Sequence, residues 1–245
     1  IHSEIYKEAS DAYFTQNPYA VYPSENGLDF AISVEEAKAM LQEDKEEYTI
    51  PLKTLYPNVT TNMIGQEAFP DLLSSFPTYY STSDRDRTTN LILAANKING
   101  TVVMPGEVFS YNQVVGERTI AVGYKEAPIY VNGEVVDGLG GGICQVTSTL
   151  YNAVVLANLE IVERSNHQFV PSYVKASRDA TVVYGSIDFK FKNNRNYPIK
   201  ILCSVNNGVV NFAIYGLKTA DDYEVEISSR ITSQTSSYTN SEAYK

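Results

Sequence analysis

The sequence has few of the residues that build metal centres, disulfide frameworks and nucleic-acid surfaces. Its 245 residues include two cysteines, two histidines and no tryptophan. The cysteines and histidines lack the close pairing of zinc ligands, so we expect no metal site and no cofactor. Lys and Arg number 19 against 29 Asp and Glu, and the net charge of −10 argues against a nucleic-acid partner. No apolar run is long enough to predict a membrane span.

The overall composition is that of a globular protein. Hydrophobic residues make up 43% of the chain and charged residues 20%, and the length suits one large domain or a medium domain with a smaller companion. The 19 tyrosines, the acidic balance and the scarcity of cysteine favour a bacterial surface or wall protein. Because the sequence starts at Ile1 without a methionine, we expect any signal or anchor segment to lie outside it.

A glycine-rich stretch at residues 137–142 is the centre of the functional prediction. It includes Gly140, Gly141 and Gly142, and such a sequence predicts a loop because each glycine loses much backbone entropy on ordering. Residues 145–158 then carry apolar side chains at helical spacing. Cys144 is therefore expected at a helix N-terminus, where the helix dipole favours a thiolate and free N–H groups can hold an oxyanion. The alternative is a small buried cysteine after a simple turn.

The rest of the chain predicts an α+β protein. We expect a short helix after Ser33, with Glu36 completing a capping box, and a second helix after Asp84 that ends at Gly100. Asn132-Gly133 and Asn207-Gly208 each predict a hairpin turn. Strands are predicted at 48–52, 101–104, 127–131, 134–136, 160–164, 168–174, 180–184, 186–191, 199–204 and 209–215. The expected fold is an antiparallel sheet packed with the buried helix that follows the glycine-rich loop, plus a small N-terminal α/β segment.

Five ordered blocks of sequence resemble the VanW family, which is named from glycopeptide-resistance operons. The blocks are 90–95, 105–112, 140–151, 163–167 and 179–182. The resemblance implies a Gram-positive cell envelope, the extracellular face as the location, and a link to vancomycin-type resistance. Residues 1–57 are similar to the end of a peptidoglycan-binding module. The domain plan is therefore that module at 1–57, a linker or extended arm at 58–83, the VanW domain at 84–220 and a polar tail at 221–245.

Two functions fit these observations. The first is a cysteine-dependent acyl-transfer enzyme, a hydrolase or transpeptidase, that acts on peptidoglycan stem peptides or on a surface protein. Cys144 would be its nucleophile and His167 its general base, with Asp179 or Asp188 orienting the imidazole. The second is a non-catalytic peptidoglycan-binding module whose partners are peptidoglycan or wall peptides. Within the family blocks and the glycine-rich loop, the substrate-binding candidates are Gly140, Gly141, Gly142, Gln145, Tyr111 and Arg164.

The second cysteine has a structural interpretation. Cys203 lies in a predicted strand whose inward positions are Ile199, Ile201 and Cys203, so we expect it to fill core space and to form no disulfide with Cys144. The sequence leaves the oligomeric state open.

Overall fold

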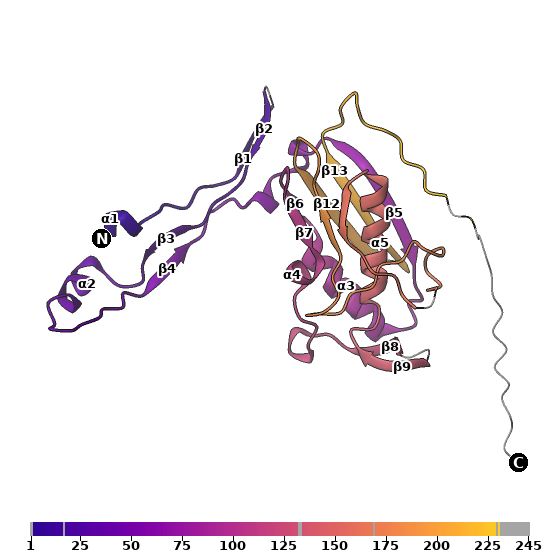
Figure 1. Cartoon of the computed structure of the whole chain (residues 1–245), viewed down its shortest axis with the longest axis horizontal. Coiled ribbons are helices and arrows are strands. Elements are labelled where there is room, and N and C mark those ends of the chain that lie inside the picture. The colour runs from indigo at the N-terminus through magenta and orange to yellow at the C-terminus, as the bar shows by residue number, and fades with distance from the viewer. Residues whose placement is uncertain (1, 17, 132–133, 169, 229, 231–245) are drawn as a thin grey trace, which may run out of the picture.

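The computed structural model of the chain describes residues 2–16, 18–131, 134–168, 170–228 and 230. Figure 1 shows a slender N-terminal arm that leads into a larger body of sheets and helices. The arm comprises α1 (His2–Ile5), β1 (Tyr13–Gln16), β2 (Tyr19–Tyr22), β3 (Gly27–Phe30), α2 (Val34–Met40) and β4 (Leu52–Leu55). β1 pairs with β2 and β3 with β4, both antiparallel. The predicted capping box of α2 is confirmed, because Ser33 and Glu36 bond each other's backbone. The strand predicted at 48–52 is wrong for all but Leu52, the residue where β4 begins.

The main sheet of the body has four antiparallel strands. Its order is β5-β13-β12-β6, and the strands are β5 (Asp71–Tyr79), β6 (Val102–Val103), β12 (Ile199–Asn206) and β13 (Val209–Gly216). The short 3-10 helices η1 (Thr61–Met63) and η2 (Gln66–Ala68) precede β5. The prediction of a linker or extended arm over 58–83 is therefore wrong for 71–79, which pair with β13 along its whole length. The predicted turn at Asn207-Gly208 is confirmed, with both residues at positive φ.

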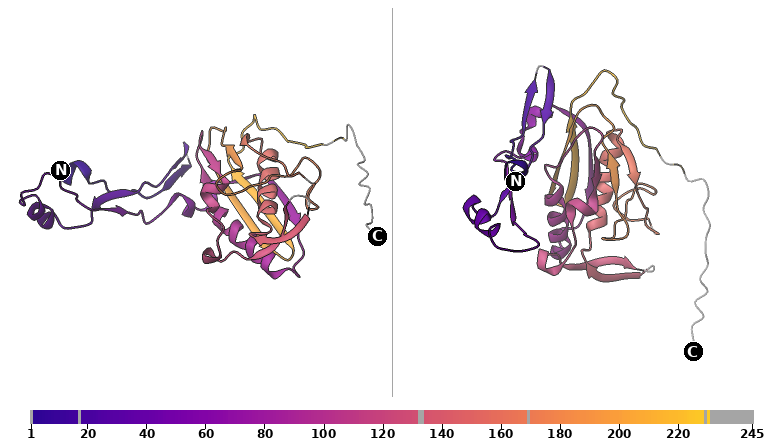
Figure 2. Two further views of the ribbon diagram at one scale, coloured as in Figure 1. Left: turned by 60° about the horizontal axis from the view of Figure 1, so that its bottom comes forward. Right: turned by 60° about the vertical axis from the view of Figure 1, so that its left-hand side comes forward.

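Two long helices lie on the same face of this sheet. They are α3 (Arg85–Ile98) and α5 (Ile143–Leu156). Cys203 of β12 bonds the Ala95 carbonyl of α3, while Ser74 of β5 bonds the Ala153 carbonyl of α5. Strand register puts Ser74 and Cys203 on one face, since Ser74 is opposite Ile214 and Cys203 opposite Phe212. The views of Figures 1 and 2 agree that α5 runs along the sheet beside β5 and β13.

A smaller sheet completes the core on the other side of the helices. Its order is β10-β11-β7, and its strands are β7 (Val108–Ser110), β10 (Glu160–Glu163) and β11 (Lys190–Lys192). Phe109 and Phe191 stack across it at 5.0 Å, and Phe189 meets Tyr151 of α5 edge to face at 5.8 Å. The α+β class and the buried helix are confirmed: α5 is covered by sheet residues on both sides.

The remaining elements connect these layers. They are α4 (Tyr111–Val115), η3 (Ile120–Val122) and the hairpin of β8 (Glu126–Val131) and β9 (Glu134–Leu139). The hairpin is confirmed, but its predicted turn at 132–133 lies outside the described residues. The strand predicted at 168–174 is absent from the described residues there, and 180–184 make only isolated bridges through Thr181 and Val183. The strand expected at 186–191 begins at Lys190. Residues 231–245 of the predicted tail are also outside the described part.

Both cysteines are free, as predicted. Cys203 packs against the core with Ile199 and Ile201, which are fully buried, and so fills the space expected of it. None of the described helices has the length and hydropathy needed to cross a membrane.

Candidate functional site

The glycine-rich segment forms a tight turn between the β8–β9 hairpin and α5. β9 takes up Asp137, Gly138 and Leu139, so the loop itself is shorter than predicted and covers residues 140–142. Gly141 is packed against β8, where an added Cβ would lie 2.5 Å from the Ala127 carbonyl oxygen. The buried Asn90 side chain of α3 donates to the Gly141 carbonyl at 3.0 Å and also bonds the backbone of Lys125. The turn is therefore held rigidly where the helix begins.

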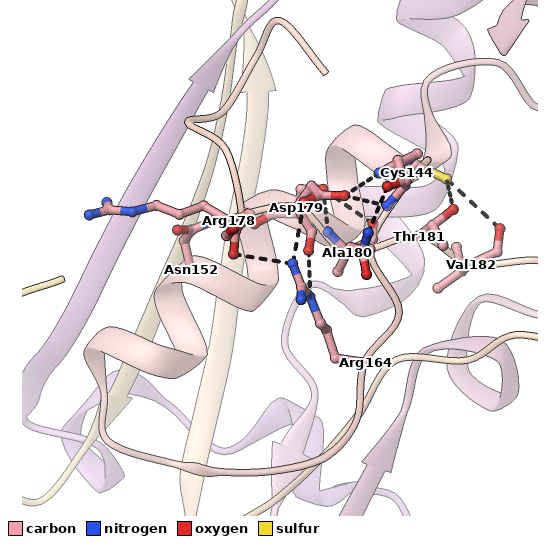
Figure 3. A network of polar contacts seen from close by, with 12 residues as sticks. Cys144, Asn152, Arg164, Arg178, Asp179, Ala180, Thr181 and Val182 are labelled. Atoms are coloured by element: carbon pink, nitrogen blue, oxygen red, sulfur yellow. Dashed lines mark hydrogen bonds and ion pairs between the residues drawn. The ribbon is translucent and has the colours of Figure 1, made fainter. Parts of the chain in front are cut away.

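Cys144 is the second residue of α5, as the sequence predicts. Its sulfur lies 3.4 Å from the Thr181 hydroxyl and 3.8 Å from the Val182 carbonyl oxygen, contacts drawn in Figure 3. The N–H groups of Ile143 and Gln145 donate back into the turn, to Gly140 and Gly142. No acceptor is found among the described residues for the N–H of Cys144. The N–H of Cys144 is therefore free to stabilise an oxyanion, and it lies at the positive end of the helix dipole.

His167 joins Cys144 to a buried carboxylate. The imidazole Nδ1 is 2.6 Å from Asp179 Oδ2, and the backbone N–H of His167 donates to the same oxygen at 2.6 Å. On its other side the imidazole lies near the Cys144 sulfur, close enough to lower the pKa of the thiol and to have its own pKa raised. Because Nδ1 is occupied by the carboxylate, Nε2 is the nitrogen left for the sulfur. The structure thus brings Cys144, His167 and Asp179 together, with the imidazole hydrogen-bonded to the carboxylate and lying near the sulfur.

The three groups shift one another's pKa in a consistent way. Burial by itself would raise the pKa of the Cys144 thiol, but the hydrogen bonds with His167 and Thr181 outweigh it, and the pKa falls below its ordinary value. Burial would lower the pKa of His167, yet contacts with Cys144 and Asp179 raise it. Burial also acts to raise the pKa of Asp179, and the hydrogen bonds from His167 overcome this and lower it. These directions favour a thiolate, an imidazolium and a carboxylate together.

Asp179 is itself fixed in place by Arg164 and by α5. The Arg164 guanidinium donates to the Asp179 carbonyl at 2.7 Å and to its Oδ1 at 3.3 Å, a position that Figure 3 shows beside the carboxylate. Ser148 of α5 exchanges hydrogen bonds with both backbone groups of Ala180, and Asn152 donates to the Arg178 carbonyl. Arg164, expected to bind substrate, thus positions Asp179 through its Nε and Nη2 donors, which bond residues 177 and 179.

Two other candidates lie away from this chain of groups. Asp188 accepts hydrogen bonds from the Ser110 hydroxyl at 2.5 Å and from the Asn112 backbone N–H at 2.9 Å. Its carboxylate therefore links β7 to α4 and makes no hydrogen bond with His167. Tyr111 is fully buried and lines neither of the two cavities near the site. No part of its side chain reaches solvent, and its role in binding substrate stays a prediction.

A cavity of about 920 Å³ opens onto the cysteine. Cys144 and His167 both line it, together with Gly140, Gly142 and Gln145. Gly141 does not, since it is turned toward Ala127. Gln145 is almost fully buried, and its amide bonds Arg87, Thr78 and the Tyr79 carbonyl. It forms a wall between this cavity and a smaller one of about 330 Å³.

Sequence reasoning missed several residues that shape the site. Arg87, Arg118 and Tyr173 line the large cavity, while Asn90 and Ser148 hold the backbone around it. Asn90 and Ser148 left a signal, because each lies in a block that carries the family resemblance, 90–95 and 140–151. Tyr173 lies in the segment predicted as a strand, and only the folded chain brings it near Cys144. Burial raises the pKa of Tyr173, so it faces the cavity as a neutral phenol. In the described part of the chain, no cluster of three or more His, Cys, Asp or Glu residues could hold a metal ion.

Comparison with known proteins gives a family and two relatives. The family model described as VanW like protein matches residues 86–215. The chain is 44% identical over 166 residues to the uncharacterized protein YoaR of Bacillus subtilis (strain 168), covering 68% of this chain and 54% of that protein. It is 30% identical over 128 residues to the vancomycin B-type resistance protein VanW of Enterococcus faecalis (strain ATCC 700802 / V583), covering 50% and 46%. The chain thus spans about half the length of these curated relatives. No solved structure matches it.

Proposed function

The chain belongs to the VanW family, and we propose that it is a cysteine-dependent acyl-transfer enzyme, a hydrolase or transpeptidase, acting on peptidoglycan stem peptides or a surface protein. The observation that carries the proposal is the grouping of Cys144 with the hydrogen-bonded His167–Asp179 pair, with Cys144 and His167 lining the same large cavity. One relative is named for vancomycin B-type resistance, which supports a substrate at the extracellular face of the cell envelope.

In the first half of the reaction, the Cys144 thiolate attacks a peptide carbonyl carbon. A C–S bond forms, and the carbonyl oxygen becomes an oxyanion that the free N–H of Cys144 stabilises. The C–N bond then breaks, and the leaving amine takes the proton from Nε2 of the His167 imidazolium. Asp179 keeps the imidazole oriented throughout, since it holds Nδ1 at 2.6 Å. The product of this half is a thioester on Cys144.

In the second half, the neutral His167 acts as the general base. It removes a proton from water in a hydrolase, or from an amine in a transpeptidase, and the activated nucleophile attacks the thioester carbonyl. The C–S bond breaks, the thiolate leaves, and the imidazolium is restored. Both outcomes use the same three residues, so the choice between them depends on which nucleophile enters the cavity.

Alkylation of the native protein tests the nucleophile. At pH near 6.5 a free thiol of pKa about 8.5 is only about 1% thiolate. Cys144 should react with iodoacetamide at least about tenfold faster than such a thiol, and His167→Ala should remove most of this excess, because the imidazole lowers the pKa of Cys144. Peptide mass spectrometry measures the rate at each cysteine. Cys203 is the internal control, since burial raises its pKa to about 12.

The same samples separate the enzyme from a non-catalytic peptidoglycan-binding module. Peptidoglycan fragments incubated with the enzyme should yield shortened or newly cross-linked stem peptides, and the Cys144→Ala variant should yield none. Labelling of Cys144 no faster than a model thiol, and unaffected by His167→Ala, would contradict the proposal. Binding of the fragments without any change in them would favour the module.

A further inference from the structure

The large cavity has a charge opposite to that of the protein as a whole. The chain carries a net charge of −10, yet the charged side chains that line the cavity, besides the Cys144 thiolate and the His167 imidazolium, whose charges offset each other, are Arg87, Arg118 and Glu117. Glu117 is exposed to solvent, where its field is weakened by water and salt. Arg87 and Arg118 are both partly buried, and in the described part of the chain neither lies within 4.0 Å of a carboxylate oxygen. Two cations without acidic partners therefore face the space in front of Cys144.

Arg118 has hydrogen-bonding capacity to spare. Its Nη1 donates to the Asn112 side chain at 2.8 Å, and its guanidinium lies 5.4 Å from the Tyr111 ring centre and 5.8 Å from that of Tyr184. Its Nη2 is buried and has no partner among the described residues. A buried charged donor without an acceptor is costly and is uncommon in folded proteins. Arg118 itself lines the cavity, so a small turn of its guanidinium would bring this unpaired donor to an acceptor carried by a ligand.

The side chains of both arginines lie against the glycine turn. A Cβ added to Gly140 would lie 3.6 Å from Cβ of Arg118, and one added to Gly142 would lie 3.2 Å from Cγ of Arg87. Arg87 also donates to the Gln145 side chain at 2.9 Å, so its guanidinium is tied to the residue after the nucleophile. The stems of both arginines thus pack against the turn that positions Cys144.

We propose that this cavity selects an anionic acyl donor, a peptide that presents a carboxylate, and that Arg118 is its main binding residue with Arg87 as the second. A guanidinium matches a carboxylate geometrically, with two parallel N–H donors for its two oxygens. The inference rests on the proposed function, since it describes the substrate of the same cysteine. It adds a charge requirement that the mechanism itself does not need.

Two alkylating reagents of similar size test this directly on the full chain. Iodoacetate carries a carboxylate and iodoacetamide does not, so their rate ratio at Cys144, divided by the ratio for 2-mercaptoethanol, reports the local charge independently of thiol reactivity. We expect a normalised ratio on the order of tenfold in favour of iodoacetate at low salt. It should fall when salt is raised to about 1 M, because counterions screen the guanidinium charges.

Variants assign the effect to a residue. Arg118→Gln should lower the ratio severalfold, Arg118→Lys should keep most of it because the charge remains, and Arg87→Gln should lower it less. Arg85→Gln is the matched control, since Arg85 is an exposed arginine of the same helix as Arg87 and lines neither cavity. It should leave the ratio unchanged.

The possible results separate this inference from the function on which it rests. A normalised ratio of one or less in the unaltered protein, with fast labelling by both reagents, would overturn the charge selection alone and leave the nucleophile standing. A ratio that is high but unchanged in both Arg118→Gln and Arg87→Gln would likewise overturn the charge selection by these arginines. Slow labelling by both reagents would overturn the proposed function and this inference together. The ratio in the unaltered protein needs no variant to fold.

Discussion

At the scale of single residues, the site depends on whether one proton resides on Cys144 or on His167. The pKa of the thiol is lowered and that of the imidazole is raised, each largely through contact with the other once the opposing effect of burial is overcome. Both directions favour the thiolate–imidazolium pair over the neutral thiol and imidazole. Asp179 stabilises the imidazolium of this pair, because its carboxylate is ionised and accepts a hydrogen bond from Nδ1.

The raised pKa of His167 can be measured by NMR titration of its ring protons. The chain has two histidines, so a His2→Gln variant assigns the signals. His167 should titrate above the usual value of about 6.5, and both Asp179→Asn and Cys144→Ala should lower its pKa, because each removes a group that favours the imidazolium. Asp188→Asn is the control and should leave it unchanged, since Asp188 bonds Ser110 and Asn112 instead. A wild-type value at or below about 6.5 would refute the coupled pair.

The same shifts set how the fold responds to pH. Because the pKa of His167 is raised in the folded state, its protonation stabilises the fold fully below the unfolded-state value and this contribution is lost as pH rises through the folded-state value. Asp179 acts in the opposite direction: its lowered pKa stabilises the fold above the unfolded-state value and is lost as pH falls through the folded-state one. The two contributions overlap in mildly acidic solution.

At the scale of elements, the glycine turn explains why the cysteine helix starts where it does. Gly140 and Gly142 adopt positive φ values of 80° and 107°, which side chains of L-residues rarely tolerate. Gly141 is required for a different reason, the close approach of Ala127. The turn therefore depends on backbone conformation at two positions and on space at the third.

Gly141→Ala should destabilise the fold by about 1–3 kcal/mol, because the added Cβ would lie 2.5 Å from a backbone oxygen and the β8–β9 hairpin would have to move. It should also slow alkylation of Cys144 as the helix start shifts. Gly185→Ala is the matched control: that glycine has a φ of 79° and open space around it, so the cost is limited to backbone strain of roughly 1–2 kcal/mol. Urea titration gives both free energies of unfolding. Equal alkylation rates in Gly141→Ala and the unaltered protein would show that the turn does not position the cysteine.

At the scale of the whole molecule, the arm and body meet through residues that precede β5. Lys200 of β12 donates to the carbonyls of Asn62 and Ile64, and Phe69 is fully buried in a small cluster with residues of β1 and β2. The body therefore includes more of the chain than the family match at 86–215. The N-terminal boundary of the body therefore lies before η1.

Two shortened chains test that boundary. A chain that starts at Ser81, close to the domain start predicted from sequence, lacks β5 and should show no cooperative thermal transition, because β13 loses its partner and α5 loses the contacts of Ser74 and Thr78. A chain that starts at Asn58 keeps β5 and η1 and should unfold cooperatively. Circular dichroism during heating distinguishes them. Cooperative unfolding of the chain starting at Ser81 would mean that β5 is dispensable.

The sequence by itself determined the local features that follow from short-range physics. A glycine run followed by apolar residues at helical spacing was enough to place Cys144 at a helix start, and Ser33 with Glu36 was enough for a capping box. The NG turn of the last hairpin and the α+β class followed in the same way. Each depends on backbone preferences within a few residues, so the pattern is present in the sequence.

Only the tertiary structure decided what depends on distant partners. β5 was not predicted because its polar residues do not alternate as those of a half-exposed strand would. Ser74 and Thr78 are buried, since each hydrogen-bonds α5, and Pro77 is tolerated because β5 lies at the edge of the sheet. The sequence of residues 168–174 alternates as a strand would, yet no neighbouring strand among the described residues pairs with this segment, and its Gln168, Val170, Pro171 and Tyr173 line the cavity. Asp179 and Asp188 could not be told apart in sequence. Packing settled the choice: Ser148 holds the backbone beside Asp179 on the cysteine helix, and Ser110 and Asn112 bind the carboxylate of Asp188.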